Sequence, residues 1–251
     1  MSVVAIIPAR YGSTRFPGKP LARIGAKPMI QHVYESAAAA GVVGRTLVAT
    51  DDARIVEAVR AFGGEAVMTS GDHLSGTDRL AEVAAGLDAE WVVNLQGDLP
   101  FVEAETIRGS VDCLTRDAAV PMATARTPIS SEDEFLNRNV VKVVTDEQGF
   151  ACYFSRAPIP FHRERPSEPA VWGHRHLGIY VYRRDFLLRF TALPPAAPEL
   201  AEGLEQLRAL HHGFRIRVVD VVETGVEVDT PDDLKRAEAY WSQLQPGKRY
   251  A

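Results

Sequence analysis

Short apolar runs alternate with amphipathic segments over the first half of the chain, and this alternation restricts the possible folds more than any other feature. The apolar runs have the length of buried strands, and the segments between them carry apolar residues at helical spacing. Parallel strands need a long crossover between them, so the pattern predicts an α/β fold with a mostly parallel sheet. The predicted strands are 3–7, 45–50, 65–68 and 91–95, and the predicted helices are 28–41, 51–63, 77–84 and 103–115.

The pattern changes in the second half of the chain, where strands predominate. A turn at 146–149 makes a hairpin of two of them. The segment 155–173 is rich in proline and charge, which predicts a loop or an arm rather than core. The predicted strands are 120–125, 140–145, 150–154, 174–182 and 214–222, and helices are expected from 184, over 198–212 and from 231 to about 244.

Composition limits the class of protein. The chain has 251 residues, of which 46% are hydrophobic and 24% are charged, which indicates one large globular domain or two small ones. A net charge of −5 argues against a nucleic-acid surface. We find neither an apolar run of ~20 residues, the length of a membrane span, nor a signal-peptide pattern. We therefore expect a soluble, cytoplasmic protein that binds neither nucleic acid nor membrane.

The two cysteines, Cys113 and Cys152, follow neither metal-ligand spacing nor a disulfide framework. We expect both to be small buried hydrophobic residues.

The loop after the first predicted strand contains the features of a polyphosphate site. We expect Pro8 to end the strand, because proline cannot donate to its ladder. Glycines let backbone amides approach a ligand, and guanidinium and ammonium groups match phosphate oxygens. An ordinary solvated connection is the alternative, but closely spaced cations repel one another unless an anion lies among them. The loop supplies two glycines, two hydroxyls and three cations: Gly12, Gly18, Ser13, Thr14, Arg10, Arg15 and Lys19.

Two common phosphate-binding motifs are excluded by spacing. A P-loop has four residues between its glycines and a Ser or Thr after its Lys. Here five residues separate Gly12 from Gly18, and Pro20 follows Lys19. The dinucleotide fingerprint G-x-G-x-x-G is absent as well. The loop therefore binds phosphate by another geometry.

Acidic and polar residues follow the later strands of the predicted sheet. Asp98 comes after strand 91–95, where it is either a helix cap or a ligand-binding carboxylate. A carboxylate beside phosphates would be repelled unless a divalent cation lay between them, which points to Mg²⁺. The segment 75–78 is equally a capping sequence or a ligand contact by itself, and its place after a parallel strand favours the ligand contact. Asp229, read alone, is a helix N-cap.

Three motifs occur in one order in this chain: Ile7 to Pro20, Gln96-Gly97-Asp98 and Val228 to Leu234. Together they resemble the sugar cytidylyltransferases, and most closely the branch that acts on 3-deoxy-manno-octulosonate (Kdo). The resemblance runs from residue 3 to about residue 240. It includes the segments 153–160, 175–180 and 204–208, and the chain lacks the Gly-Gly-Ser-Lys loop of the related sialate enzymes.

The resemblance implies a Rossmann-like, glycosyltransferase-A-like nucleotidyltransferase fold: three layers around a mixed, mostly parallel sheet, with a small β-rich part. It implies one domain over 1–251, in which 1–117 mainly binds nucleotide, 118–222 mainly binds sugar and forms a homodimer, and 223–245 carries a metal-ligand segment and a closing helix. The implied reaction transfers CMP from CTP to Kdo with Mg²⁺, giving CMP-Kdo and diphosphate for lipopolysaccharide biosynthesis.

The resemblance also implies roles for individual residues. The catalytic residues would be Arg10, Lys19, Asp98 and Asp229, of which Asp98 and Asp229 would hold Mg²⁺. The nucleotide would contact Pro8, Ala9, Arg10, Ser13, Lys19, Ser75, Gly76 and Arg79. The sugar would contact Gln96, Arg156, His176, Tyr180, Glu205 and Gln206.

One position departs from the family pattern. The family commonly has Glu after the motif aspartate, whereas this chain has Leu99. The change removes a carboxylate beside the expected metal, but it leaves Asp98 in place. This departure motivates one alternative, a catalytically silent CTP-binding module. A second alternative, in the same class of enzyme, is a cytidylyltransferase for another acidic sugar, such as a sialic acid or an amino-Kdo.

Overall fold

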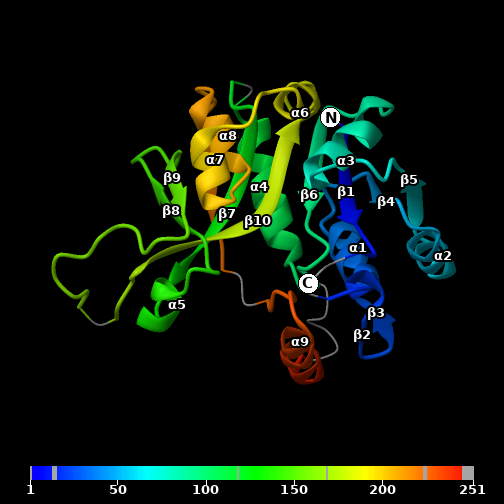
Figure 1. The fold of residues 1–251 in the computed structure, drawn as a ribbon, viewed down its shortest axis with the longest axis horizontal. Helices are drawn as coiled ribbons and strands as arrows, with labels where there is room; N and C mark the ends of the chain where they lie inside the picture. Colours follow the sequence, from blue (N-terminus) through cyan, green and yellow to red (C-terminus); the bar gives the residue numbers. More distant parts are fainter. Residues whose placement is uncertain (1, 13–15, 118, 168, 223–224, 245–251) are drawn as a thin grey trace. The chain divides into compact units, whose positions relative to one another are not determined.

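A computed structural model of the chain describes residues 2–12, 16–117, 119–167, 169–222 and 225–244 (Figure 1). The chain divides into two compact units. Unit 1 comprises Met1–Arg108, Tyr182–Thr191 and Glu223–Ala251, and unit 2 comprises Gly109–Val181 and Ala192–Val222.

Unit 1 is built on four parallel strands in the order β6-β1-β4-β5. The strands are β1 (Val3–Ala9), β4 (Arg45–Thr50), β5 (Glu65–Met68) and β6 (Trp91–Leu95). The helices are α1 (Met29–Ala39), α2 (Ala53–Ala61), α3 (Gly76–Ala85), α6 (Arg184–Thr191) and α9 (Pro231–Gln243). A short 3₁₀ helix, η1 (Lys19–Leu21), and a two-stranded sheet of β2 (Arg23–Ile24) and β3 (Lys27–Pro28) complete this unit.

The order of the strands creates a topological switch point beside β1. The chain runs from β1 to β4 and β5 in one direction, and then returns to place β6 on the other side of β1. Because such crossovers are right-handed, α1 and α2 cover one face of these strands and α3 covers the other. The loops after β1 and β6 therefore diverge at a topological switch point, where α/β sheets bind ligands.

An apolar cluster fixes α9 within unit 1. Met29 from α1 and Ala237 from α9 are buried in this cluster together with Val228, which lies just before α9. Gly25 approaches so closely that a Cβ atom there would lie 2.6 Å from Nε1 of Trp241. Its φ of +59° is also one that residues with a side chain rarely adopt. The cluster thus sets the position of the segment that leads into α9.

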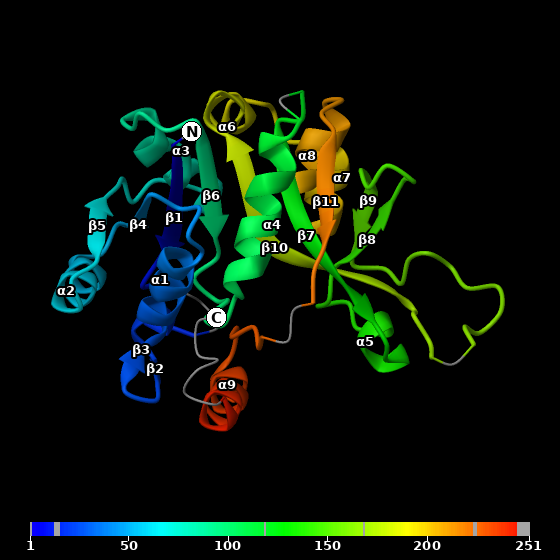
Figure 2. The same cartoon turned by 180° about the vertical axis from the view of Figure 1, so that it is seen from behind.

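Unit 2 contains the remaining strands, some of them antiparallel (Figure 2). Strand β11 runs parallel to β7, whereas β8 is antiparallel to both β9 and β10. The strands are β7 (Met122–Ile129), β8 (Lys142–Thr145), β9 (Ala151–Ser155), β10 (Gly173–Arg183, whose last two residues belong to unit 1) and β11 (Ile216–Asp220). The helices are α5 (Glu132–Leu136), α7 (Ala197–Glu202) and α8 (Gln206–His211), and α4 (Ala104–Thr115) begins in unit 1.

The predicted α/β class with a mixed, mostly parallel sheet is confirmed, but the predicted end of the first strand was wrong. Strand β1 continues through Pro8 to Ala9, and Pro8 pairs in register with Ala49 of β4. The ladder to β6 spans only Val3–Ile6, so at Pro8 the strand needs a partner on one side only. A missing N–H is tolerated in that position.

Three predictions for unit 2 were also wrong. The expected helix 198–212 is two helices, because Gly203 adopts a left-handed φ of +62° that ends α7. Cys152 is exposed on β9 and Cys113 is half-buried, so neither is the buried hydrophobic residue expected. The end of the proline-rich segment is not outside the core, because Ala170 and Trp172 are buried against Ile129 of β7.

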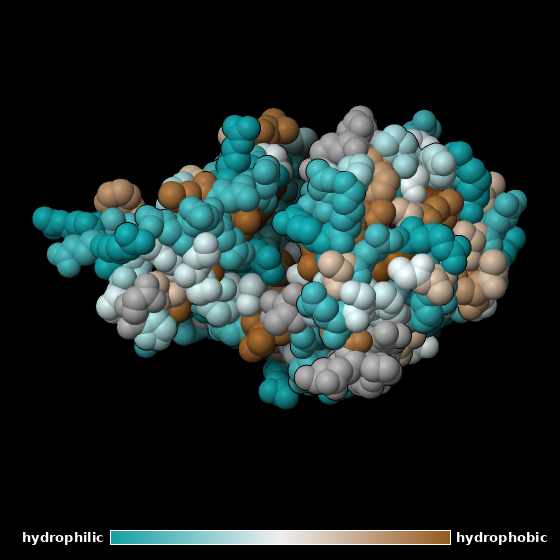
Figure 3. Space-filling model, turned by 90° about the horizontal axis from the view of Figure 1, so that it is seen from below, coloured by the Kyte–Doolittle hydropathy of each residue, from teal (hydrophilic) through white to brown (hydrophobic). Residues whose placement is uncertain are grey.

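Hydrophilic side chains predominate on the face shown in Figure 3, where apolar residues form scattered patches. Within the described part of the chain, we find no helix with the length and hydropathy that crossing a membrane would require.

Replacing His32 should reduce the pH dependence of stability. His32 is fully buried with Nε2 2.9 Å from the carbonyl of Ile24, and burial lowers its pKa below the ordinary 6.5. The unfolded chain therefore binds a proton that the folded protein does not as the pH falls below 6.5, so acid lowers the free energy of unfolding. We expect this loss between about pH 7.5 and about pH 5.5 to be smaller in His32→Gln, measured by urea unfolding.

The matched control for this experiment is His211→Gln, because His211 is exposed at the end of α8. It should lose as much stability on acidification as the unmodified protein. An equal loss in His32→Gln would show that His32 does not contribute.

Candidate functional site

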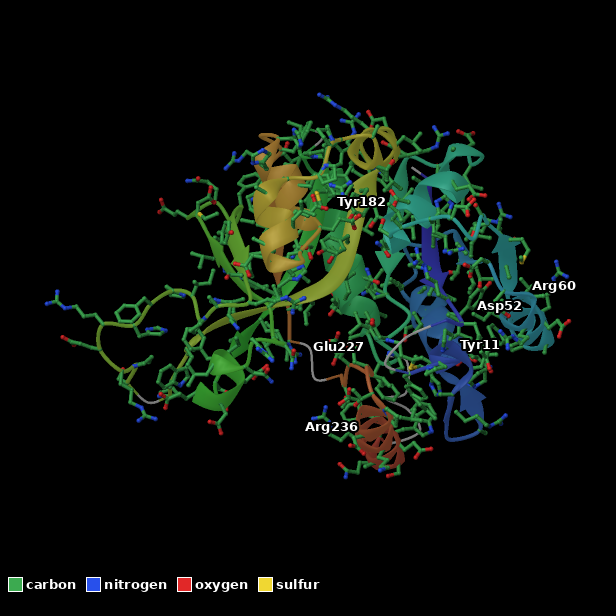
Figure 4. All side chains as sticks on the ribbon, in the orientation of Figure 1. Tyr11, Asp52, Arg60, Tyr182, Glu227 and Arg236 are labelled. Carbon is green, nitrogen blue, oxygen red and sulfur yellow. The ribbon has the colours of Figure 1, made fainter. Side chains whose placement is uncertain are left out.

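Three carboxylates from two distant segments meet in unit 1. Asp98 follows β6, and Glu227 and Asp229 precede α9. One oxygen from each lies within 4.8 Å of the others. Figure 4 shows Glu227 on the segment that leads into α9. We call these residues the carboxylate cluster.

A backbone hydrogen bond brings the two segments together. The N–H of Val228 donates to the carbonyl of Asp98 at 2.9 Å. The Val228 side chain is buried in the apolar cluster. Because side chains alternate along an extended segment, burying Val228 turns Glu227 and Asp229 to the opposite side. The cluster therefore follows from one hydrogen bond and one buried valine.

The sequence position of Asp229 alone suggests that it caps α9, but in the structure it does not. The N-cap is Thr230, whose hydroxyl accepts from the N–H of Asp233 at 3.3 Å. The Asp233 carboxylate accepts in return from the N–H groups of Thr230 and Asp229, at 2.9 and 3.0 Å. Thr230 and Asp233 thus cap the helix, and the carboxylate of Asp229 belongs to the cluster.

The ammonium group of Lys19 lies between two members of the cluster. Its Nζ is 3.2 Å from Oδ2 of Asp98 and 3.3 Å from Oδ1 of Asp229. The three side chains are only 15%, 24% and 29% exposed, so solvent screens their interaction incompletely. Lys19 carries one positive charge against three carboxylates, so this group of four residues has an excess of two negative charges.

The loop before Lys19 is closed by Tyr11. The N–H of Gly18 donates to the carbonyl of Tyr11 at 2.8 Å, and Gly18 has a left-handed φ of +73°. A Cβ atom at Gly18 would lie 3.2 Å from the Tyr11 ring, and the guanidinium of Arg54 lies over that ring, 3.3 Å from its centroid. These contacts fix the end of the loop at Gly18, the residue before Lys19. Ser13 and Arg15 lie outside the described residues.

The start of α3 and the loop after β6 both approach Pro8 closely. A Cβ atom at Gly76, in the first turn of α3, would lie 3.3 Å from the Pro8 ring, and one at Gly97 would lie 3.3 Å from the Pro8 carbonyl. Ser75 caps α3 in a capping box with Asp78. The capping interpretation of this segment is correct, and its ligand contact stays a prediction. Glycine lets these backbones approach closely.

The other predicted nucleotide residues lie in or beside the same loops. Arg10 follows β1 and donates from Nη2 to the carbonyl of His73 at 2.6 Å. Arg79 is fully buried and pairs through Nη2 with Asp51 at 2.9 Å. Ala9 is buried at the end of β1. Arg79 is therefore held as a structural cation, whatever else it contacts.

Two of the predicted sugar-binding residues lie in polar turns. Gln96, in unit 1, accepts from the N–H of Leu99 at 3.2 Å through its carbonyl. Arg156, in unit 2, binds Glu202 twice: its N–H donates to the carboxylate at 2.9 Å, and its Nε donates to the carbonyl at 2.8 Å. This arrangement fixes the backbone and part of the guanidinium of Arg156.

His176 and Tyr180 share a buried part of unit 2. Their ring centroids are 5.4 Å apart, and Nε2 of His176 lies 2.9 Å from the hydroxyl oxygen of Thr124. Burial lowers the pKa of His176 to about 3, so the ring is neutral. Burial, and secondarily the charge of Glu205, raises the pKa of Tyr180. Gln206, the first residue of α8, is buried. The structure therefore brings His176, Tyr180 and Glu205 into one region.

The carboxylate cluster fits a hard divalent cation. Such cations prefer carboxylate oxygens and take further ligands from phosphate or water. Asp98 and Asp229 were predicted as the ligands, and Glu227 is an additional candidate that sequence reasoning missed. Its signal was the alternation in Glu227-Val228-Asp229, which places two carboxylates on one side of an extended segment. Glu227 also adds a carboxylate to a cluster in which Leu99 supplies none.

Comparisons with known proteins agree on one family. A family model for cytidylyltransferases matches residues 4–216. A protein named 3-deoxy-manno-octulosonate cytidylyltransferase from Syntrophotalea carbinolica is 54% identical over 246 residues, which cover 96% of this chain and 98% of the relative. A protein of that name from Geobacter metallireducens is 53% identical, covering 98% of this chain and all (100%) of the relative.

Solved structures extend the comparison to the fold. The structure of a CMP:2-keto-3-deoxy-manno-octonic acid synthetase in complex with CTP matches with a TM-score of 0.91 and 47% identity, covering 97% of this chain and 99% of that chain. A cytidylyltransferase from Leptospira borgpetersenii shares the fold, with a TM-score of 0.65 and 16% identity over 100% of this chain and 90% of its own.

Isosteric changes in the cluster should shift metal affinity in opposite directions. Glu227→Gln removes a carboxylate and should weaken Mn²⁺ binding by about tenfold, whereas Lys19→Met removes the competing ammonium and should strengthen it by a similar factor. Titrations of the nucleotide-free protein, followed by calorimetry or by the electron paramagnetic resonance of Mn²⁺, measure both effects.

Asp232→Asn is the matched control for these titrations. Asp232 is 87% exposed in the first turn of α9 and pairs with Lys235. This change should leave Mn²⁺ affinity unaltered. Weaker binding in Lys19→Met, or unchanged binding in Glu227→Gln, would contradict the assignment of the site.

Proposed function

The chain belongs to the cytidylyltransferase family, and we propose that it transfers CMP from CTP to Kdo, giving CMP-Kdo and diphosphate. This reaction activates Kdo for lipopolysaccharide biosynthesis. The observation that carries the proposal is the position of Lys19 Nζ, between Asp98 and Asp229, at the end of the loop that follows β1. A cation and paired carboxylates beside a switch point suit a metal-bound triphosphate.

The reaction needs positioning and charge neutralisation rather than a covalent intermediate. The anomeric hydroxyl of Kdo attacks the α-phosphorus of CTP, a new P–O bond forms, and diphosphate leaves with its bonding electrons. Lys19 and Arg10 bind the phosphate oxygens and stabilise the charge that grows on the leaving group. The hydroxyl proton passes to solvent or to a carboxylate of the cluster.

Cytidylyltransferases generally use a divalent metal ion, and we propose Mg²⁺ for this chain. Asp98 and Asp229 would hold it, with Glu227 in reach as a third carboxylate. When bound, the ion supplies charge neutralisation at the phosphate oxygens.

We assign the nucleoside to the region around Pro8, where the start of α3 and the loop after β6 approach the end of β1. Their close approach at Gly76 and Gly97 leaves little space for side chains, which suits a flat base against backbone. Ser75, Arg79 and Ala9 belong to this part, and Ser13, which lies outside the described residues, stays a predicted nucleotide contact. We assign the acidic sugar to a set of polar residues in unit 2, where Arg156 offers a cation for its carboxylate, and for Gln96, in unit 1, a sugar contact stays a prediction. That set is Arg156, His176, Tyr180, Glu205 and Gln206.

We also propose that the protein is a cytoplasmic homodimer in which the segment 155–173 is a subunit contact. Phe161, in this segment, is 88% exposed, and a second copy of the chain would cover it.

A turnover assay tests the proposed function. The purified protein, CTP and Mg²⁺ should release diphosphate with Kdo much faster than with a sialic acid or an amino-Kdo. Absence of diphosphate release with Kdo, together with release with another acidic sugar, would reassign the substrate. Binding of CTP without turnover of any of these sugars would indicate the silent nucleotide-binding module instead.

Two isosteric variants test the assignment of the metal ligands. Asp98→Asn and Asp229→Asn should each lower kcat by about a hundredfold or more, because each would weaken the binding of the divalent ion whose positive charge stabilises the transition state. Circular dichroism should be unchanged, and Asp232→Asn should turn over normally. A near-native kcat in either variant would remove that residue from the metal site.

A further inference from the structure

The segment 69–75, which joins β5 to α3, is held at its start by a buried arginine. The guanidinium of Arg79 is fully buried and contacts the hydroxyl of Thr69 and, at 3.2 Å, the carbonyl of Ser70. Asp51 balances its charge at 2.9 Å. The N–H of Thr69 also donates to the carbonyl of Thr50 at 2.9 Å. We call this segment the 69–75 loop.

Glu82, on α3, holds the same loop at two further points. Its Oε2 accepts from the N–H of Ser70 at 3.0 Å and also contacts Nε2 of His73. The hydrogen bond from His73, followed by that from Ser70, lowers the pKa of the Glu82 carboxyl. Glu82 is therefore an ionised acceptor for both groups at neutral pH, and it fixes the position of His73 relative to α3.

His73 in turn holds Arg10. The carbonyl of His73 accepts from Nη2 of Arg10 at 2.6 Å, which joins the loop after β1 to the 69–75 loop. The imidazole of the same residue is bound to Glu82, so both the side chain and the backbone of His73 are engaged. A continuous chain of contacts runs from Glu82 through His73 to the guanidinium of Arg10.

We propose that Glu82 is a positioning residue that, through His73, orients the guanidinium of Arg10 for the triphosphate of CTP. The proposal rests on the function proposed above, because it takes Arg10 as a phosphate-binding residue. An arginine side chain has many rotamers, and fixing it before the ligand arrives reduces the entropy lost on binding. Glu82 contributes by this preorganisation, without contact with the nucleotide.

This role predicts a loss that depends on the phosphates. Arg10 would bind the triphosphate and not the base. A change in the position of its guanidinium should therefore weaken CTP binding far more than CMP binding. A residue that merely stabilised the 69–75 loop near the base would weaken both nucleotides alike. The ratio of the two affinities therefore distinguishes positioning from general structural support.

The experiment measures dissociation constants for CTP and CMP by calorimetry, with Mg²⁺ and without sugar. Glu82→Ala should weaken CTP binding by about tenfold, while CMP binding changes by less than about twofold. Glu82→Gln should weaken CTP binding less than Glu82→Ala does, because the amide oxygen can still accept the hydrogen bond from the N–H of Ser70. The matched control is Glu65→Ala, which removes an exposed carboxylate paired with Arg45 and should change neither affinity.

A double-mutant cycle shows whether Glu82 acts through Arg10. In the Arg10→Ala background, Glu82→Ala should weaken CTP binding almost no further, because the guanidinium that Glu82 positions is absent. Additive losses, or equal losses for CTP and CMP, would overturn the proposal. If Glu82→Ala fails to fold, the same cycle with Glu82→Gln tests whether Glu82 acts through Arg10. This variant replaces the carboxylate with an amide of the same size.

Failure of this inference is distinct from failure of the proposed function. An unmodified protein that binds CTP, with a Glu82→Ala variant that binds it equally well, rejects the positioning role alone. An unmodified protein that does not bind CTP rejects the proposed function itself, and with it the role of Arg10.

Discussion

The hydrogen bond from the N–H of Val228 to the carbonyl of Asp98 joins two segments that are far apart in the sequence, and the candidate site depends on it. It is maintained by the burial of the Val228 side chain in the apolar cluster. With this contact in place, Glu227 and Asp229 face the carboxylate that follows β6. Apolar packing thus helps to hold three carboxylates close together, and Lys19 pairs with two of them.

The sheet could be predicted from the sequence because its signals are local. Strands β1, β4, β5 and β6 are apolar runs, and the helices between them have apolar residues at helical spacing. The errors arose where a local rule was outweighed by neighbours. Pro8 stays in β1 because only β4 needs its backbone there. Gly203 ends α7 because it adopts a left-handed conformation that the spacing of apolar residues does not reveal.

The site could be predicted in part, for a different reason. Lys19, Asp98 and Asp229 stand in motifs that resemble a known family, and the structure brings them together. Glu227 was missed because the alternation of Glu227, Val228 and Asp229 places the two carboxylates on one side only once Val228 is known to be buried. The link from Glu82 to Arg10 could not be predicted, because it passes through the backbone carbonyl of His73. Every residue has a backbone carbonyl, so the sequence does not show which of them accepts a hydrogen bond from Arg10.

The contact between Gly25 and Trp241 ties the acidic side of the site to a turn near the start of the chain. The indole lies where any side chain at position 25 would have to lie. Since Trp241 belongs to the helix that Glu227 and Asp229 precede, displacing the indole would displace two carboxylates as well. A side chain at position 25 would therefore have to move Trp241, and with it the helix that follows Glu227 and Asp229.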